Sequence, residues 1–140
     1  MKFAHLTVSG LTDSRGKSVK RPVLIVELKA KDGSILEVPA VVDSGADTTT
    51  VNLQYADALG IKLGEEGTIL GIGKGKVPRW MGHLPFRIKQ TDFKLDVPAW
   101  YVDSENVGIL LGQEVFFDMF RIKFEKDRDT FELIPVKRNS

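Results

Sequence analysis

The segment Val41–Val51 reads V-V-D-S-G-A-D-T-T-T-V and joins an apolar strand to an acidic turn. Asp43 directly follows the run Ala40–Val42, so its carboxylate is expected where a buried strand exits into a loop. Gly45 allows a tight turn that a side chain would hinder, and Ser44 offers a small hydroxyl. Taken alone, the segment fits an ordinary β-turn as well as it fits a catalytic loop.

The segments around this loop have the pattern of short strands. Pro22–Ala30 and Ile35–Val42 are apolar and β-branched, and the turn signal Asp32-Gly33 joins them. Four more segments have strand character: Leu84–Lys89, Phe93–Val102, Phe120–Phe124 and Thr130–Val136. This number of strands in a chain of 140 residues predicts an all-β fold, either a small, mainly antiparallel closed barrel or a sandwich.

Two short helices are expected besides the strands. Asn52 is a good cap for Leu53–Leu59, and Gly60 follows as a left-handed stop. Gln113–Met119 follows Gly112 and is the second candidate. Both are too short to be stable without packing on a sheet. In the second, the apolar side chains predicted to face the sheet are those of Val115, Phe116, Met119 and Phe120.

The composition excludes several classes of function. Twenty basic and nineteen acidic side chains give a net charge of +1, so no overall field favours nucleic acid or an anionic membrane. The absence of cysteine removes disulfides, thiolate metal sites and cysteine nucleophiles. The N-terminal apolar run is too short for a signal peptide, and no apolar stretch has membrane-spanning length. We therefore expect a soluble, cytoplasmic protein.

Two further features of the sequence belong with the acidic loop. Ile109-Leu110-Leu111-Gly112, followed by Q-E-V-F-F-D-M-F, lies near the C-terminus, and the glycine-rich stretch T-I-L-G-I-G-K-G-K-V lies between. In this order, the three features resemble the active-site loop, second signature and flap of the retropepsin-like aspartic proteases. The similarity covers Val23–Pro135 and suggests a cellular or prokaryotic single-domain member. It implies an acid-protease-like closed barrel with one or two short helices, in one domain over residues 1–140 with a core at about 22–136.

The resemblance also implies a role for each matching residue. Asp43 would be catalytic, and Ser44 and Gly45 would interlock the two active-site loops of a dimer. Substrate would be bound by residues of the loop and of the flap, namely Gly45, Ala46, Asp47, Gly71, Ile72, Gly73, Lys74 and Gly75. The structural second signature would be Leu111, Gly112 and Gln113. Retroviral members commonly have arginine at the last position, whereas Gln113 can donate a hydrogen bond to Asp47 but cannot form an ion pair. No metal or cofactor is implied.

Counting carboxylates predicts the oligomeric state. Aspartic proteolysis needs two carboxyl groups that share a proton, yet this sequence has only one D-S-G. Asp13 and Asp103 are also followed by serine, but neither turn contains the glycine. The second Asp43 must therefore come from a second copy of the chain, and the predicted protein is a symmetric homodimer that cleaves an extended polypeptide.

Two alternatives remain open at this stage: a non-catalytic dimeric binding or assembly module on the same fold, and an unrelated β-barrel that binds a small ligand. The stretch after Gly71 is not a phosphate loop, because Val77 follows Lys76 where Ser or Thr is required. His5 and His83 are isolated and predict no metal site. Trp80 and Trp100 are expected in the core or at the edge of a substrate pocket.

Overall fold

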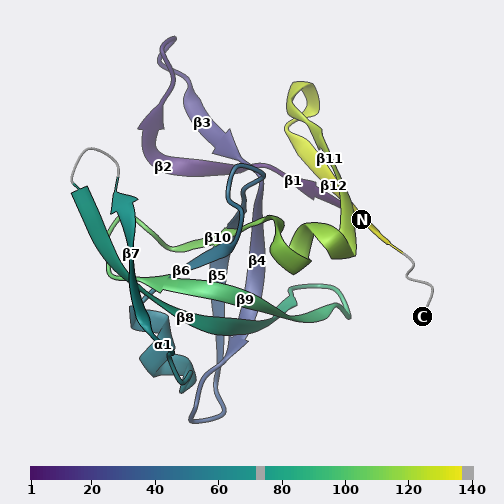
Figure 1. The fold of residues 1–140 in the computed structure, drawn as a ribbon. Helices are drawn as coiled ribbons and strands as arrows, with labels where there is room; N and C mark the ends of the chain where they lie inside the picture. The colour runs from purple at the N-terminus through teal and green to yellow at the C-terminus, as the bar shows by residue number, and fades with distance from the viewer. Residues whose placement is uncertain (72–74, 137–140) are drawn as a thin grey trace.

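The fold begins from one hairpin, which the computed structural model shows clearly within the residues it describes, 1–71 and 75–136 (Figure 1). Strands β4 (Val23–Lys29) and β5 (Ile35–Val42) pair antiparallel over their whole lengths. The turn between them needs glycine, because residue 33 has φ 91°. Both strands and their turn agree with the prediction from sequence.

The hairpin is part of a closed barrel of six strands in the order β4-β5-β10-β6-β9-β8, with β8 pairing back to β4. The four added strands are β6 (Thr49–Asn52), β8 (Gly75–Ile88), β9 (Lys94–Val102) and β10 (Ile109–Leu111). Most pairs are antiparallel, but β10 runs parallel to β5, and β6 runs parallel to β9. The predicted closed barrel is confirmed, and a sandwich is not what forms.

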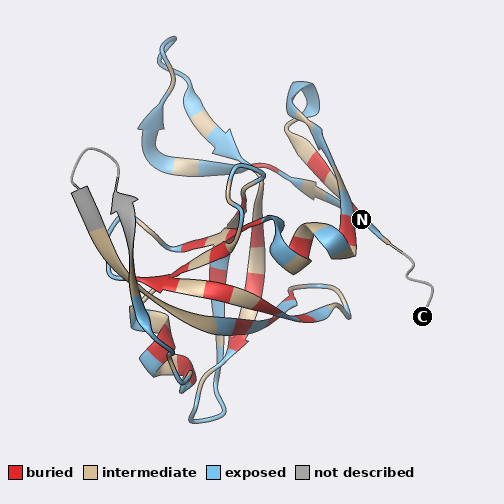
Figure 2. Cartoon of the chain, viewed as in Figure 1, coloured by how far each residue is buried: buried red, intermediate tan, exposed pale blue. Residues whose placement is uncertain are grey.

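The core fills the inside of this barrel, as Figure 2 shows. Alternate residues of each strand face inward, which is the expected period of a strand with one buried face. On β4 and β5 the buried side chains are Leu24, Val26, Leu28, Val38, Ala40 and Val42, and on β8 and β9 they include Leu84, Phe86, Ile88, Val97, Ala99 and Tyr101. The intervening residues point away from the core, and this alternation determines which side chains share a face with Asp43.

Strand β7 (Glu66–Gly71) pairs with the first part of β8 and forms a hairpin beyond the barrel strands (Figure 1). The pairing ends with Gly71 opposite Gly75. The predicted flap is therefore a hairpin whose two strands end at these glycines. Its other predicted members, Ile72, Gly73 and Lys74, lie outside the described residues. Strand β8 is much longer than the predicted Leu84–Lys89, because its first half pairs with β7 despite lacking a regular apolar alternation.

Two smaller sheets lie outside the barrel (Figure 1). One has the order β1-β12-β11 and contains β1 (Lys2–Ala4), β11 (Phe120–Glu125) and β12 (Thr130–Pro135). The other is the hairpin of β2 (Leu6–Thr12) and β3 (Ser18–Arg21), which is almost entirely exposed (Figure 2). The sequence predicted β11 and β12 but none of the first three strands, because residues 2–21 bury too little apolar surface to show a pattern.

Both predicted helices are present, the first as a regular helix and the second as an irregular one. Helix α1 (Gln54–Leu59) is capped by Asn52, whose side-chain oxygen accepts the Gln54 N–H at 3.0 Å, and it stops at Gly60, which has φ 68°. Gln113–Phe117 forms an irregular helical turn, broken at Glu114 and at Val115, which has φ 67°. None of the helices within residues 1–71 and 75–136 combines the length and hydropathy needed to cross a lipid bilayer.

The second helix is irregular in its first turn, where the N–H groups bind the Asp43 loop and a side chain. Gln113 and Glu114 donate to carbonyls of the Asp43 loop, and Val115 donates to the Asp118 carboxylate at 3.2 Å. The predicted packing of its apolar side chains is nevertheless confirmed. Phe116 and Phe120 are buried in the core, and Val115 and Met119 pack against it.

His5 lies buried between β1 and β2, and both of its ring nitrogens lack a hydrogen-bond partner. Burial lowers the pKa of this histidine; the Asp129 carboxylate, 3.9 Å away, opposes the shift, while Lys126 and Lys20 add to it. Below about pH 6.5, the ordinary pKa of histidine, the unfolded chain takes up a proton that the folded protein resists. Acid should therefore destabilise the fold through His5.

We expect His5→Phe to raise the free energy of unfolding by about 1 kcal/mol at neutral pH, because it removes two buried polar atoms without partners. The gain should widen as the pH falls below about 6.5. Urea unfolding at one protein concentration, on both sides of this pH, measures both effects. An equal pH dependence in the variant and the wild type would contradict the assignment to His5.

Candidate functional site

Asp43 stands directly after β5, where its backbone is still held by the sheet. Val42 pairs with Leu111 of β10, and the Asp43 N–H donates to the Leu111 carbonyl at 2.9 Å. The Asp43 carboxylate accepts a hydrogen bond from the Gly45 N–H at 2.9 Å, and the backbone carbonyl of Asp43 accepts one from the Ala46 N–H at 3.2 Å. The predicted tight turn is therefore present, and it orients the carboxylate that the turn carries.

The segment after β10 fastens this loop along its length. Because β10 lies between β5 and β6, its last residues leave the sheet directly beneath the loop that joins those two strands. The N–H groups of three consecutive residues donate into the loop: Gly112 to Thr49 Oγ1 at 3.1 Å, Gln113 to the Ala46 carbonyl at 2.8 Å, and Glu114 to the Asp47 carbonyl at 2.9 Å. The two predicted signatures are thus one structural unit.

Gly112 is required at this crossing by contact, not by backbone conformation. Its φ of −100° is open to any residue. A Cβ atom there would lie 2.6 Å from the Thr48 carbonyl carbon and 2.7 Å from the oxygens of Ala46 and Thr48. All three atoms belong to the backbone of the loop, so none can turn aside as a side chain could. The absence of a side chain at residue 112 lets the two segments approach closely enough to form the three hydrogen bonds.

Gln113 replaces the missing arginine in an unexpected way. Its side-chain amide donates to the Ser44 carbonyl at 2.8 Å, and so supports the turn beside Asp43 rather than the Asp47 carboxylate. The Asp47 side chain is exposed and has no ion-pair partner among the described residues. Its backbone, however, is held by Glu114. Asp47 is therefore well positioned in the main chain, while its carboxylate remains free for a ligand.

The side chains next to Asp43 on the outward side of the barrel follow the register from strand to strand around its curved surface. Val42 faces the core, so the alternation places the Asp43 carboxylate on the opposite side, together with Val41. The register extends this face through side chains that are all half-buried: Leu110 on β10, Thr50 on β6, Trp100 on β9 and Met81 on β8. On the same outward side of β8, His83 and Pro85 are exposed. The outward side chains near Asp43 are therefore less exposed than those at His83 and Pro85, and most of them are apolar.

Sequence reasoning missed two parts of this site. Thr49 is completely buried, and its hydroxyl accepts the Gly112 N–H, but it stands in a run of three threonines that gave no reason to separate it from its neighbours. The second part is Arg79, whose guanidinium carbon lies 3.8 Å from the centre of the Trp100 ring. The prediction that Trp100 lies at a pocket edge remained one of two options. The pairing of Trp100 with β6 brings it into line with the outward residues next to Asp43. Strand β6 was not predicted, so the sequence did not reveal this alignment.

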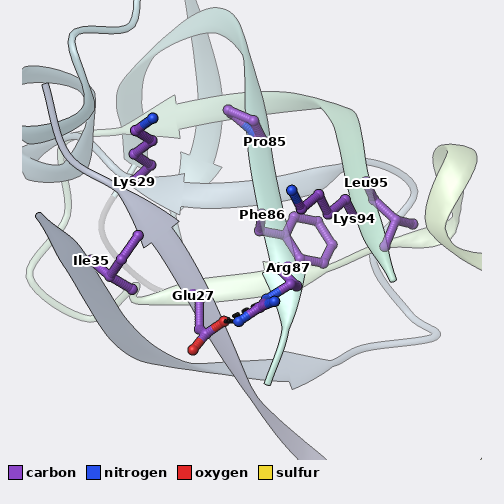
Figure 3. Close-up of a pocket in the computed structure, with 8 residues that line it drawn as sticks. All are labelled: Glu27, Lys29, Ile35, Pro85, Phe86, Arg87, Lys94 and Leu95. Carbon is purple, nitrogen blue, oxygen red and sulfur yellow. Dashed lines mark hydrogen bonds and ion pairs between the residues drawn. The ribbon is translucent and has the colours of Figure 1, made fainter. Parts of the chain in front are cut away.

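A pocket of about 350 Å³ lies elsewhere on the barrel (Figure 3). It opens where β4 and β8 separate beyond their last pair, Glu27 and Arg87, whose side chains form an ion pair at its edge. Ile35 lines it at the start of β5, about 23 Å along the strand from Val42 at the other end. This pocket is therefore at the opposite end of the barrel from Asp43 and is not the candidate active site. Within the described ranges, no group of three His, Asp or Glu side chains could hold a metal ion.

Comparison with known proteins agrees with this geometry. Residues 26–115, which include both Asp43 and Gly112, match the family model described as aspartyl protease. None of the curated protein sequences matches the chain.

Solved structures share the fold at low sequence identity. The retropepsin-like aspartic protease from Rickettsia conorii has a TM-score of 0.55 and 18% identity, over 76% of this chain and 95% of that chain. The retroviral protease-like domain of Ddi1 from Leishmania major has a TM-score of 0.52 and 15% identity, over 84% and 96%. The EIAV protease in complex with the inhibitor HBY-793 has a TM-score of 0.49 and 22% identity, over 77% and 93%. The two structures with TM-scores above 0.5 support a retropepsin-like barrel.

Proposed function

Because this chain belongs to the aspartyl protease family, we propose that it is an endopeptidase that acts as a symmetric homodimer. Residues 1–140 would form one protease domain with a core at about 22–136. The observation that carries the proposal is the fastening of the D-S-G-A loop by Gly112, Gln113 and Glu114, which holds the backbone beside Asp43 at the end of β5. A turn that served only to reverse the chain would not need this support.

In the proposed mechanism the two Asp43 carboxyls share one proton and hold a water molecule between them. One carboxylate takes a proton from the water as it attacks the scissile carbonyl, and the other carboxyl gives its proton to the carbonyl oxygen. No covalent enzyme intermediate forms. The Gly45 N–H donates a hydrogen bond to the Asp43 carboxylate and so fixes its orientation in the turn. Ser44, which is exposed at the loop, would contact the loop of the second chain.

The substrate would lie extended on the face that Asp43 shares with Leu110 and Thr50. Gly45, Ala46 and Asp47 would bind its main chain, and the β7–β8 hairpin would close over it and exclude bulk water. The flap residues Gly71, Ile72, Gly73, Lys74 and Gly75 belong to this part of the proposal. Recognition through the main chain would leave much of the specificity to the side chains that line the face.

The proposal is tested by incubating the purified protein with casein from mildly acidic to neutral pH, with and without pepstatin. We expect cleavage that pepstatin suppresses, and a solution mass about twice the chain mass of 15.6 kDa. An active monomer would refute the shared site. A dimer that cleaves neither casein nor a broad peptide library would instead support the non-catalytic binding module.

Subunit mixing tests the shared pair of carboxyls directly. If wild-type chains are refolded with about nine equivalents of the Asp43→Asn chain, random pairing places about nine in ten of the wild-type chains in mixed dimers. Activity per wild-type chain should then fall to about one tenth. Each chain would keep its full activity if one Asp43 were enough. Refolding with Asp103→Asn under the same conditions is the control, because that exposed residue lies outside the proposed dyad.

A further inference from the structure

The Arg79–Trp100 pair is a charged feature on the same face of the sheet as Asp43. Arg79 lies opposite Val102 of β9, and Trp100 lies opposite Met81 of β8, so register places the two side chains diagonally on the outward face. The guanidinium carbon of Arg79 is 3.8 Å from the centre of the Trp100 ring. Stacking on an indole fixes a guanidinium while leaving the hydrogen-bond donors at its edge available.

Among residues 1–71 and 75–136, the charge of Arg79 has no internal partner. None of the ion pairs among the described residues involves this guanidinium, and its Nε is buried without a hydrogen-bond acceptor. The residue is only half-exposed, so solvent compensates its charge incompletely. On β7 the residue opposite it is Gly67, and a Cβ there would lie 3.6 Å from the Arg79 Nε. The arginine is thus fixed between Trp100 and a glycine, with its charge unpaired.

The position of the pair defines which part of a substrate it would meet. Asp43 follows β5, and β9 is three strands away in the order β5-β10-β6-β9, about 14 Å along the curved surface of the barrel at the usual spacing of strands. An extended peptide covers this distance in about four residues. Leu110 and Thr50 lie between, and both are uncharged. Arg79 would therefore meet a substrate side chain several residues from the scissile bond.

We propose that Arg79, held on Trp100, is a specificity residue that selects an acidic side chain of the polypeptide at this distance from the cleavage site. The inference rests on the proposed function, because it assumes that a peptide lies on the Asp43 face. A glutamate or aspartate carboxylate matches the planar donors of the guanidinium and supplies the missing countercharge.

The test uses the Asp43→Asn protein, so that binding is measured without cleavage. An array of extended peptides carries either Glu or Gln at one position in turn. Binding to this array identifies the position at which Glu is preferred most, and the Glu and Gln peptides for that position are then compared. We expect this protein to bind the Glu peptide about tenfold more tightly than the Gln peptide, the usual scale for a hydrogen bond to a charged group. Adding Arg79→Gln should reduce this ratio to about one, and adding Arg79→Glu should reverse the preference towards Lys.

Two comparisons make the result specific. Arg121→Gln removes the same charge from an exposed position on β11 and should leave the Glu preference as it is. Trp100→Leu removes the aromatic support and should weaken the preference while keeping the charge. Equal binding of the Glu and Gln peptides at every position would overturn the inference, as would a preference that survives Arg79→Gln. In both cases cleavage of casein by the wild type would leave the proposed protease function intact.

Discussion

Asp43→Asn is expected to reduce kcat for peptide cleavage by about 10⁴-fold or more. In a symmetric dimer one substitution removes both carboxyls, and general acid and general base catalysis contribute about 10²–10⁴-fold each. An amide neither takes a proton from water nor gives one to the carbonyl oxygen at neutral pH. The loss should appear in kcat more than in KM, because the side chain acts on the reacting atoms rather than on substrate binding.

The same variant should keep its fold, which makes the loss interpretable. The asparagine side-chain oxygen can still accept the Gly45 N–H, so the turn retains the hydrogen bond that Asp43 makes at 2.9 Å. We expect the unfolding free energy to change by less than about 1 kcal/mol, the usual worth of one hydrogen bond. Asp103 is also followed by a serine, but the next residue is not glycine. The Asp103→Asn variant should therefore cleave as the wild type does. Equal cleavage by the Asp43→Asn and wild-type proteins would remove the protease proposal.

Gly112→Ala should cost about 3 kcal/mol of stability, a large share of the 5–15 kcal/mol typical of a folded domain. The added methyl group would lie 2.6 Å from the Thr48 carbonyl carbon and 2.7 Å from two carbonyl oxygens. These close contacts can be relieved only if the Asp43 loop and the end of β10 separate. Such a separation breaks the hydrogen bonds from Gly112, Gln113 and Glu114. We therefore expect activity to fall along with stability. Urea unfolding and casein cleavage measure the two effects.

Gly108→Ala is the matched control for this prediction. Gly108 lies just before β10, and a Cβ atom there has nothing within 4 Å. The same substitution should change the unfolding free energy by less than about 1 kcal/mol, because it restricts the unfolded chain without adding a close contact in the folded one. If the two alanine variants were equally stable at equal protein concentration, the close contact at Gly112 would not be what requires glycine there.

The parts of the fold that were predictable share one property: their sequence pattern is long enough to see. β4 and β5 alternate over seven and eight residues and meet at Asp32-Gly33. Helix α1 has both a capping residue and a glycine stop. In contrast, β6 and β10 have four and three residues, which is too short for periodicity, and they form strands only because partners lie on both sides. Gln113–Met119 has a helical pattern and forms a helix, but the pattern does not show that its backbone departs from helical geometry at Glu114 and Val115.

The candidate site was predictable in identity more than in arrangement. Asp43 and Gly112 could be named from the two signatures, yet the sequence does not tell why the glycine is needed, because the contact is with the backbone of residues far away in the chain. Gln113 was expected to act on Asp47, if on anything, and it binds the Ser44 carbonyl instead. Arg79 and Trp100 meet only through the register of β8 and β9, which no local pattern determines.

The insertion of β10 between β5 and β6 also constrains the order in which the protein can fold. The hairpin of β4 and β5 is local and can form early, whereas β10 must return from the far end of the chain to fill the gap between two strands that precede it. The Asp43 loop gains the hydrogen bonds from Gly112, Gln113 and Glu114 only at that step. During synthesis, a chain that has not yet reached Gly112 has the aspartate but not its support. The support of the Asp43 loop is therefore expected to be complete only when the barrel is nearly complete.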